Sequence, residues 1–372
     1  MVSRARELSA ADRFDRDASL DTFLTAKRMI NTGGGDNMTG ARRFVACALV
    51  GATTLALAVV PAFAQTKWDL STVWPDSNYH TQNAKRFARE VKAASGGAID
   101  ITVKDGGQLG FKGPEQLRAV RDGLVPMADI LIFQQIGDEP MAGIDSLPFL
   151  VNSFDELKIF YKYVRPEYEK MAQKHNQRVL YLAPWPTVYL FLKVKASTLE
   201  GLRNIKIRIP DKNAADMLAA VGMAPVLIPW GETIPALASG TVAGVSTSAV
   251  SAVDGKFWEL LKPGYIYPTN HFWTSDMVTV NLDAWKRLKP NHQKAVLDTA
   301  RKLEPEFWAS SLKADDDSLK RLKEGGMEVV SVPPAMLKEF RDRSAPLLSA
   351  FIKRVPAAER PIKGYLAEIK RR

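Results

Sequence analysis

The sequence predicts an α/β protein in which mainly parallel sheets are covered by helices. Short apolar runs alternate with stretches in which apolar residues recur every three to four positions. This β-α-β order occurs twice along the chain, which is typical of the α/β class. The length of 372 residues predicts two domains, at about 100–200 residues per domain.

The first series of elements lies within residues 68–133. Strands are expected at 68–74, 99–103 and 128–133, and helices at 81–95 and around 115–123. The first helix follows from the i, i+3, i+4, i+7 spacing of Ala84, Phe87, Ala88 and Val91, and Gly96-Gly97 ends it.

A helix and two strands connect this series to the second one. Ser153 and Glu156 form a helix-capping pattern, and strands are expected at 178–183 and 188–193. The second series has strands at 205–209, 225–229, 242–246 and 276–281. Between them, one helix opens at Pro210-Asp211 and a shorter one ends at Gly240.

The chain after residue 281 has a helical pattern. A continuous helix over 291–324 would be about 50 Å long at 1.5 Å per residue, with a kink at Pro305. One further helix, carrying Leu337, Phe340, Leu347 and Phe351, is expected near the C-terminus. Because no low-complexity linker is visible, the chain is expected to cross between domains through strands.

The N-terminal region carries a predicted export signal. Arg42-Arg43 precedes an uncharged apolar run over residues 44–60, and Ala62-Phe63-Ala64 is an A-x-A cleavage pattern. We expect residues 1–64 to be an upstream segment and signal peptide, with Met38 as the start and cleavage after Ala64. The mature protein would then be periplasmic. An N-terminal membrane anchor is the alternative.

The residues do not favour catalysis or a resident cofactor. No two of the four histidines (His80, His175, His271 and His292) have metal-ligand spacing, and the single cysteine, Cys47, lies within the predicted signal. No nucleophile–base pair is visible, so no enzyme, metal site or cofactor is expected. The net charge of +10 is spread thinly and no nucleic-acid-binding motif accompanies it, so no nucleic-acid partner is expected.

One cationic segment has unusual surroundings. In Lys206-Ile207-Arg208-Ile209-Pro210 the two cations fall on one side of a strand and the isoleucines on the other. Arg208 stands where a strand ends and a helix begins, and its planar fork matches a carboxylate. A surface or ion-paired arginine is the alternative from this pattern alone.

Several short motifs follow one another in a fixed order along the chain. They are Gly107-Gln108-Leu109-Gly110, Glu115–Gly123, Leu147-Pro148-Phe149-Leu150, Leu199–Pro210 and Pro229-Trp230-Gly231-Glu232, followed by Ala236–Gly244. With this order and spacing the chain resembles the DctP-type solute-binding proteins of tripartite ATP-independent periplasmic (TRAP) transporters, over nearly all of residues 67–340.

The resemblance implies a two-domain periplasmic binding protein fold with hinge strands and a long bracing helix. Domain I would comprise residues 65–186 and about 272–300, and domain II residues 187–271 and parts of 301–372. The helix at about 291–324 would span both. The Ile-Arg-Ile-Pro motif implies that Arg208 binds the carboxylate of an organic acid, which the protein would deliver to a TRAP permease, as a monomer.

Departures from the family pattern bear on the ligand. The acidic residue often found before Gly244 is Ala243 here, and no second arginine lies near Pro186–Tyr189. These changes favour an aromatic or apolar monocarboxylate over a dicarboxylate or sugar acid. Trp185, Trp230, Phe272 and Trp273 are the expected apolar lining, with Lys206 as a further polar contact; core packing is the alternative for these aromatic residues.

Two other functions remain open on the sequence alone. The same fold could serve as a periplasmic sensing subunit that presents its ligand to a signalling receptor. A periplasmic enzyme is less favoured, because no catalytic set is visible.

Overall fold

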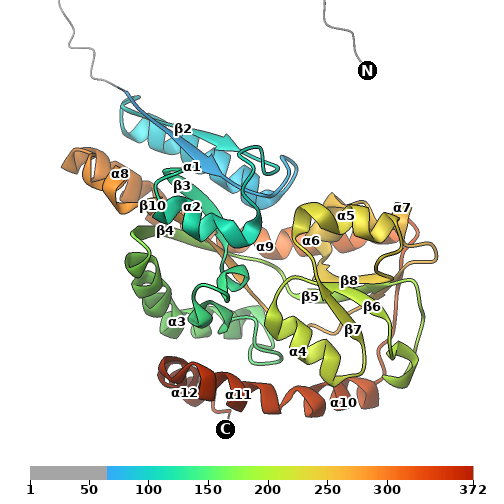
Figure 1. Ribbon diagram of the computed structural model, residues 1–372. Coiled ribbons are helices and arrows are strands. Elements are labelled where there is room, and N and C mark those ends of the chain that lie inside the picture. The colour runs from blue at the N-terminus through green and yellow to red at the C-terminus, as the bar shows by residue number, and fades with distance from the viewer. Residues whose placement is uncertain (1–64, 372) are drawn as a thin grey trace, which may run out of the picture. The chain divides into compact units, whose positions relative to one another are not determined.

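The computed structural model describes residues 65–371, which form two mixed sheets with helices on both faces (Figure 1). The predicted α/β class is confirmed. The predicted signal peptide and its cleavage site lie outside the described residues. Among residues 65–371, no helix combines the length and the apolar character that crossing a membrane requires.

Sheet I has the strand order β2-β1-β3-β10-β4. Its strands are β1 (Thr66–Ser71), β2 (Ile99–Lys104), β3 (Met127–Leu131), β4 (Gln177–Pro184) and β10 (Ser275–Asn281). Strands β2 and β3 pair in parallel with β1, whereas β10 runs antiparallel to both β3 and β4. The strand that arrives last in the sequence therefore lies inside the sheet.

Sheet II has the order β11-β9-β5-β8-β6-β7. Its strands are β5 (Val188–Leu192), β6 (Lys206–Ile209), β7 (Ala224–Leu227), β8 (Gly244–Ser248), β9 (Tyr265–Tyr267) and β11 (Glu328–Val329). Strand β6 pairs in parallel with β7 on one side and β8 on the other, and β5 is antiparallel to β8 and β9. Each sheet thus contains one strand that runs against its neighbours, β10 in sheet I and β5 in sheet II.

The helices divide between the two sheets. Those beside sheet I are α1 (Tyr79–Ala94), α2 (Gln116–Arg121), α3 (Phe154–Lys174) and α8 (Leu282–Lys286). Those beside sheet II are α4 (Lys212–Ala220), α5 (Trp230–Ala238), α6 (Ala249–Asp254) and α7 (Phe257–Leu260). Short 3₁₀ turns are η1 (Gly113–Glu115), η2 (Ile132–Gln135), η3 (Pro140–Gly143), η4 (Glu200–Leu202) and η5 (Pro356–Ala358).

The helix expected over 291–324 is α9, Pro290–Glu324, with Pro305 inside it. It packs on α1 and β4 beside sheet I and on α6 beside sheet II. The single C-terminal helix predicted from the sequence is wrong. The structure has α10 (Pro334–Ser344) and α11 (Pro346–Arg354), because Pro346 starts a new helix, and then α12 (Glu359–Glu368). Figure 1 shows this row running beneath α4 and α3.

Two extended segments carry the chain between the sheets. Residues 185–187 connect β4 to β5, and residues 268–274 connect β9 to β10. The two segments lie side by side, because the Trp185 amide donates to the Thr274 carbonyl at 2.8 Å and the Val188 amide donates to the Phe272 carbonyl at 3.3 Å. These crossings place residues distant in sequence around one point.

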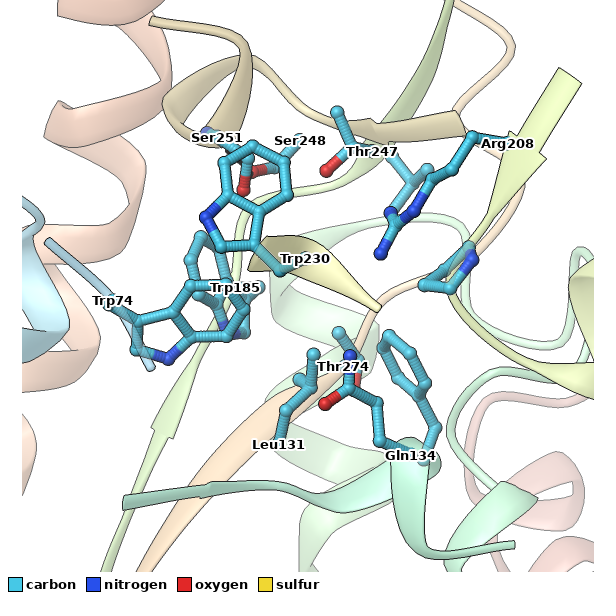
Figure 2. Close-up of a pocket in the computed structure, with 13 residues that line it drawn as sticks. Trp74, Leu131, Gln134, Trp185, Arg208, Trp230, Thr247, Ser248, Ser251 and Thr274 are labelled. Carbon is cyan, nitrogen blue, oxygen red and sulfur yellow. Dashed lines mark hydrogen bonds between the residues drawn. The ribbon is translucent and has the colours of Figure 1, made fainter. Parts of the chain in front are cut away.

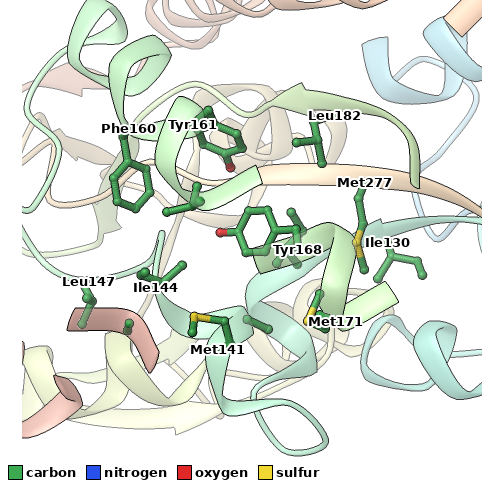
Figure 3. Packing of buried hydrophobic residues seen from close by; sticks show 14 of the residues in the cluster. Ile130, Met141, Ile144, Leu147, Phe160, Tyr161, Tyr168, Met171, Leu182 and Met277 are labelled. Carbon is green, nitrogen blue, oxygen red and sulfur yellow. The ribbon is translucent and has the colours of Figure 1, made fainter. Parts of the chain in front are cut away.

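Separate apolar cores cover the faces of each sheet. One of those at sheet I surrounds α3 and includes Tyr161, Tyr168, Met171 and Met277 (Figure 3). Helix α3 begins where Ser153 accepts the Glu156 amide, which confirms half of the predicted capping pattern. Strands β3 and β5 are buried at every residue, which agrees with their mostly apolar sequences.

Candidate binding site

A cavity lies where the two crossing segments meet the ends of several strands (Figure 2). It encloses about 380 Å³ of space between the surrounding atoms, part of which is open to solvent. Its lining residues are Trp74, Leu131, Phe133, Gln134, Trp185, Val188, Arg208, Pro210, Trp230, Thr247, Ser248, Ser251 and Thr274. Most follow or end a parallel strand, which is where open α/β sheets bind ligands.

Arg208 is the charged residue of this lining. Strand β6 buries Ile207 and Ile209 completely on the opposite side, and Arg208 itself is only 2% exposed. Its Nε donates to the Ile228 carbonyl at 2.8 Å, which fixes the plane of the guanidinium. Figure 2 shows the rest of the guanidinium directed into the cavity.

Arg208 has no anionic partner within residues 65–371 at ion-pair distance. Burial lowers the pKa of its guanidinium to about 9, and the charge of Asp211 opposes that shift. Asp211 caps α4 and accepts from Ser146 Oγ at 2.7 Å, so its carboxylate is engaged elsewhere. A buried cation without a paired anion is costly, and an anionic ligand in the cavity would remove that cost.

Two tryptophans form one wall and share a carboxylate. Trp74 Nε1 donates to Asp276 Oδ2 and Trp185 Nε1 to Asp276 Oδ1, each at 2.7 Å. Their rings meet edge to face at 4.7 Å between centroids. Trp230 stands 6.2 Å from Trp74 between centroids, and the Arg208 guanidinium carbon lies 5.9 Å from the Trp230 ring.

Behind this wall, Asp276 belongs to a buried cluster of titratable side chains with Asp129 and His80. One ligand-type atom from each lies within 4.8 Å of the others, a spacing that a metal ion would accept. Burial and the mutual repulsion of the two carboxylates raise the pKa of Asp276 well above its ordinary value, and burial raises the pKa of Asp129 to about 7. Both Asp276 oxygens already accept indole N–H groups, so the arrangement favours a carboxyl pair sharing a proton.

Three of the six predicted site residues lie in the cavity lining: Arg208, Trp185 and Trp230. The other three do not line it. Lys206 is exposed at the start of β6, two residues before Arg208, and is not part of the cavity lining. Phe272 packs edge to face on Phe133 at 5.8 Å, and Trp273 packs against Phe154 in the core around α3.

The sequence reasoning missed several lining residues, notably Trp74, Gln134, Thr247 and Thr274. Trp74 was expected inside a strand that in fact ends at Ser71, and Gln134 follows β3 in a 3₁₀ turn. Both come directly after a parallel strand, and that position is the signal that could have identified them.

Hydrogen bonds join the two sides around the cavity. Asp254 at the end of α6 accepts from Asn78 Nδ2 at 2.7 Å, and Asn213 of α4 donates to the Gly143 carbonyl at 2.7 Å. An exposed ion pair links Lys112 to Glu232 at 2.7 Å. These contacts hold the sheet I and sheet II sides together in this structure.

Comparison with known proteins gives a consistent result. Residues 70–354 match the DctP family, described as bacterial extracellular solute-binding protein, family 7. The chain is similar to the extracytoplasmic solute receptor DctP7 of Bordetella pertussis, whose structure binds pyroglutamic acid. That pair is 30% identical, with a TM-score of 0.78 and coverage of 81% of this chain and 99% of the other.

Two further relatives extend the comparison. A TRAP solute-binding protein from a marine metagenome, specific for pyroglutamate, is 27% identical with a TM-score of 0.77, covering 81% of this chain and 99% of the other. A monocarboxylate 2-oxoacid-binding periplasmic protein of Nostoc sp. is 24% identical over 297 residues, which is 76% of this chain and 79% of the relative.

Proposed function

We propose that this chain, which belongs to family 7 of the bacterial extracellular solute-binding proteins (the DctP family), captures a small monocarboxylate and delivers it to a TRAP permease. Family membership and the 30%-identical receptor confirm the resemblance predicted from the sequence and the binding protein fold. They also confirm that the chain is a solute-binding protein rather than an enzyme.

The observation that carries the proposal is the buried, unpaired guanidinium of Arg208. Its Nε is held by the Ile228 carbonyl, which leaves four N–H donors for a ligand. A carboxylate accepts two parallel bonds from such a fork. The ligand's anion would thus provide the partner that this buried cation lacks.

The rest of the cavity favours a compact acid with a single carboxylate. Arg208 is the only charged residue in the lining, so a second carboxylate would be buried without a partner. Trp74, Trp185 and Trp230 offer apolar ring surface to the body of the ligand. Because relatives at 27–30% identity bind pyroglutamate, this cyclic monocarboxylate is the leading candidate, ahead of benzoate-like acids.

The proposal extends to location and motion. We place the mature protein in the periplasm as a monomer, after cleavage behind Ala64. Sheets I and II would mark domain I (65–186 with about 272–300) and domain II (187–271 with parts of 301–372), hinged at the two crossing segments. The ligand would favour the closed arrangement because it contacts both sides only there.

The test is calorimetric titration of pyroglutamate into wild-type protein and Arg208 variants. Losing one partner of a buried charge pair costs about 2–5 kcal/mol, so Arg208→Ala should bind about 30-fold or more weakly. Arg208→Lys should recover only part, because an ammonium lacks the fork. Lys206→Ala, on the same strand but exposed, is the matched control and should bind like wild type.

A ligand panel tests the acid class separately. Thermal-shift measurements should compare pyroglutamate, benzoate, a C4-dicarboxylate and a uronate, each with wild type and with Trp230→Ala. Shifts from the monocarboxylates that shrink in Trp230→Ala support the proposal. A shift from the dicarboxylate or uronate alone contradicts the proposed acid class and leaves the role of Arg208 standing.

A further inference from the structure

Gln134 is an unusual residue in the cavity wall. It is nine-tenths buried, yet its carboxamide makes no hydrogen bond to any residue among 65–371, and its Oε1 is fully buried without a partner. A carboxamide has two N–H donors and an acceptor oxygen, and buried polar groups are almost always paired. An unpaired amide in the wall of the cavity that Arg208 also lines points to a polar group on the ligand.

The neighbouring glutamine shows the contrast. Both side chains come from η2, directly after β3. Gln135 directs its Nε2 to the Gly113 carbonyl at 2.9 Å and the Leu131 carbonyl at 3.3 Å, so it ties the turn to the fold. Gln134 contributes nothing of this kind and instead lines the cavity. Hydrogen bonds within the fold therefore explain the presence of Gln135 but not that of Gln134.

Gln134 and Arg208 approach the cavity from different sides. Gln134 follows a strand of sheet I, whereas Arg208 belongs to a strand of sheet II. Figure 2 shows the two side chains facing the same space from below and from above. A ligand whose carboxylate meets Arg208 therefore turns its opposite end toward Gln134.

Gly113 provides the room that the amide occupies. A Cβ built on Gly113 would stand 1.9 Å from Gln134 Oε1, and its three nearest neighbours all belong to the Gln134 side chain. An added methyl group at Gly113 would thus displace this amide. The lack of a side chain at Gly113 therefore allows the Gln134 amide to occupy this position.

We propose that Gln134 determines specificity by hydrogen-bonding an amide or carbonyl group on the ring of a cyclic monocarboxylate, at the end away from the carboxylate bound by Arg208. This inference rests on the proposed function and adds the second polar group of the ligand. It also gives the ligand one polar contact with each sheet, so that only an acid carrying both groups satisfies both sides.

Two acids of similar shape test the proposal. Pyroglutamate and cyclopentanecarboxylate share a five-membered ring and one carboxylate, and differ in the lactam. Wild-type protein should prefer pyroglutamate by about tenfold or more in calorimetric titrations, because the analogue leaves Gln134 unpaired. Gln134→Met keeps the length of the side chain and should remove most of this preference, chiefly by weakening pyroglutamate binding.

Two further variants separate a specific role from a structural one. As a single substitution, Gly113→Ala should reduce the preference for pyroglutamate over cyclopentanecarboxylate. It should have little further effect on that preference when combined with Gln134→Met. Gln135→Met, which loses the structural bonds, should lower the melting temperature and leave the preference unchanged.

The outcomes separate this inference from the proposed function. If Gln134→Met retains the wild-type preference while Arg208→Ala weakens both acids, Gln134 has no role in specificity and the function of Arg208 stands. If wild type binds the two acids equally, the inference is likewise overturned. If it binds neither acid, both the inference and the proposed monocarboxylate fail together.

Discussion

Asp145 is a buried carboxyl whose replacement should make the protein more stable at high pH. It lies between η3 and α3, and one of its oxygens, Oδ2, accepts from Tyr161 Oη at 2.9 Å and from Thr274 Oγ1 at 3.2 Å. The other oxygen is buried without a partner. Burial raises the pKa of this carboxyl from its ordinary 3.8 to about 7, against the opposing effect of those hydrogen bonds.

The sign of the effect follows from the two pKa values. Below pH 4 the carboxyl is protonated in both folded and unfolded chains, and no cost arises. Between pH 4 and about 7 only the unfolded chain ionises, so stability falls by about 1.4 kcal/mol per pH unit. Above pH 7 the whole cost, about 4 kcal/mol, persists. Between pH 5 and pH 8, this one group accounts for about 3 kcal/mol.

Asp145→Asn removes the titration and keeps the shape. Its Oδ1 can accept the bonds from Tyr161 and Thr274, while its Nδ2 takes the unpartnered position at a cost of about 1–3 kcal/mol that does not depend on pH. Urea denaturation followed by tryptophan fluorescence should be measured for both proteins at pH 5 and pH 8. The variant's free energy of unfolding, relative to wild type, should rise by about 3 kcal/mol between the two pH values.

This double difference cancels the constant cost of the amide and the titration of other buried groups. A relative stability that is the same at pH 5 and pH 8 would refute the reasoning, because it would mean that Asp145 is already ionised in the folded protein at pH 5. A relative stability that falls with pH would reverse the sign and also refute it.

Three other predictions concern the cavity and its closure. Asp276→Asn leaves one acceptor for two indole N–H groups, so calorimetry should show about tenfold weaker binding of pyroglutamate; unchanged affinity would contradict the role of the shared carboxylate. Asn213→Ala removes a bond between α4 on the sheet II side and η3 on the sheet I side and should increase the ligand-free radius of gyration in small-angle scattering, whereas an equal radius would exclude this contact as a determinant of closure. Lys112→Ala removes an exposed ion pair with Glu232 and should leave the midpoint of urea denaturation unchanged; a clearly lower midpoint would contradict this.

The elements with clear local patterns were predictable from the sequence. The helix over 291–324 and the strands at 99–103 and 205–209 appear within a few residues of the expected bounds. The spacing of apolar residues within each short segment is enough to predict whether it forms a helix or a strand. The split of the C-terminal helix at Pro346 was missed, although proline at the start of a new helix is a local signal.

Arg208 was also predictable, because the alternation of Ile207, Arg208 and Ile209 places the cation opposite a buried face, and the family motif supplies the same residue. The aromatic residues were predicted less well. Trp273 carries the same kind of side chain as Trp185, yet the first enters the core around α3 and the second lines the cavity. Nothing in their immediate neighbours distinguishes the two.

By itself, the sequence determined the fold class, the family and the arginine that we propose to bind the carboxylate. The tertiary structure alone decided which other side chains share the cavity with it. Asp276 receives indole N–H groups from residues 202 and 91 positions earlier, and Gln134 faces Arg208 from another sheet. Local periodicity records only which face of one element is apolar, whereas these meetings depend on strand order and on the two crossing segments, which no short stretch of sequence encodes.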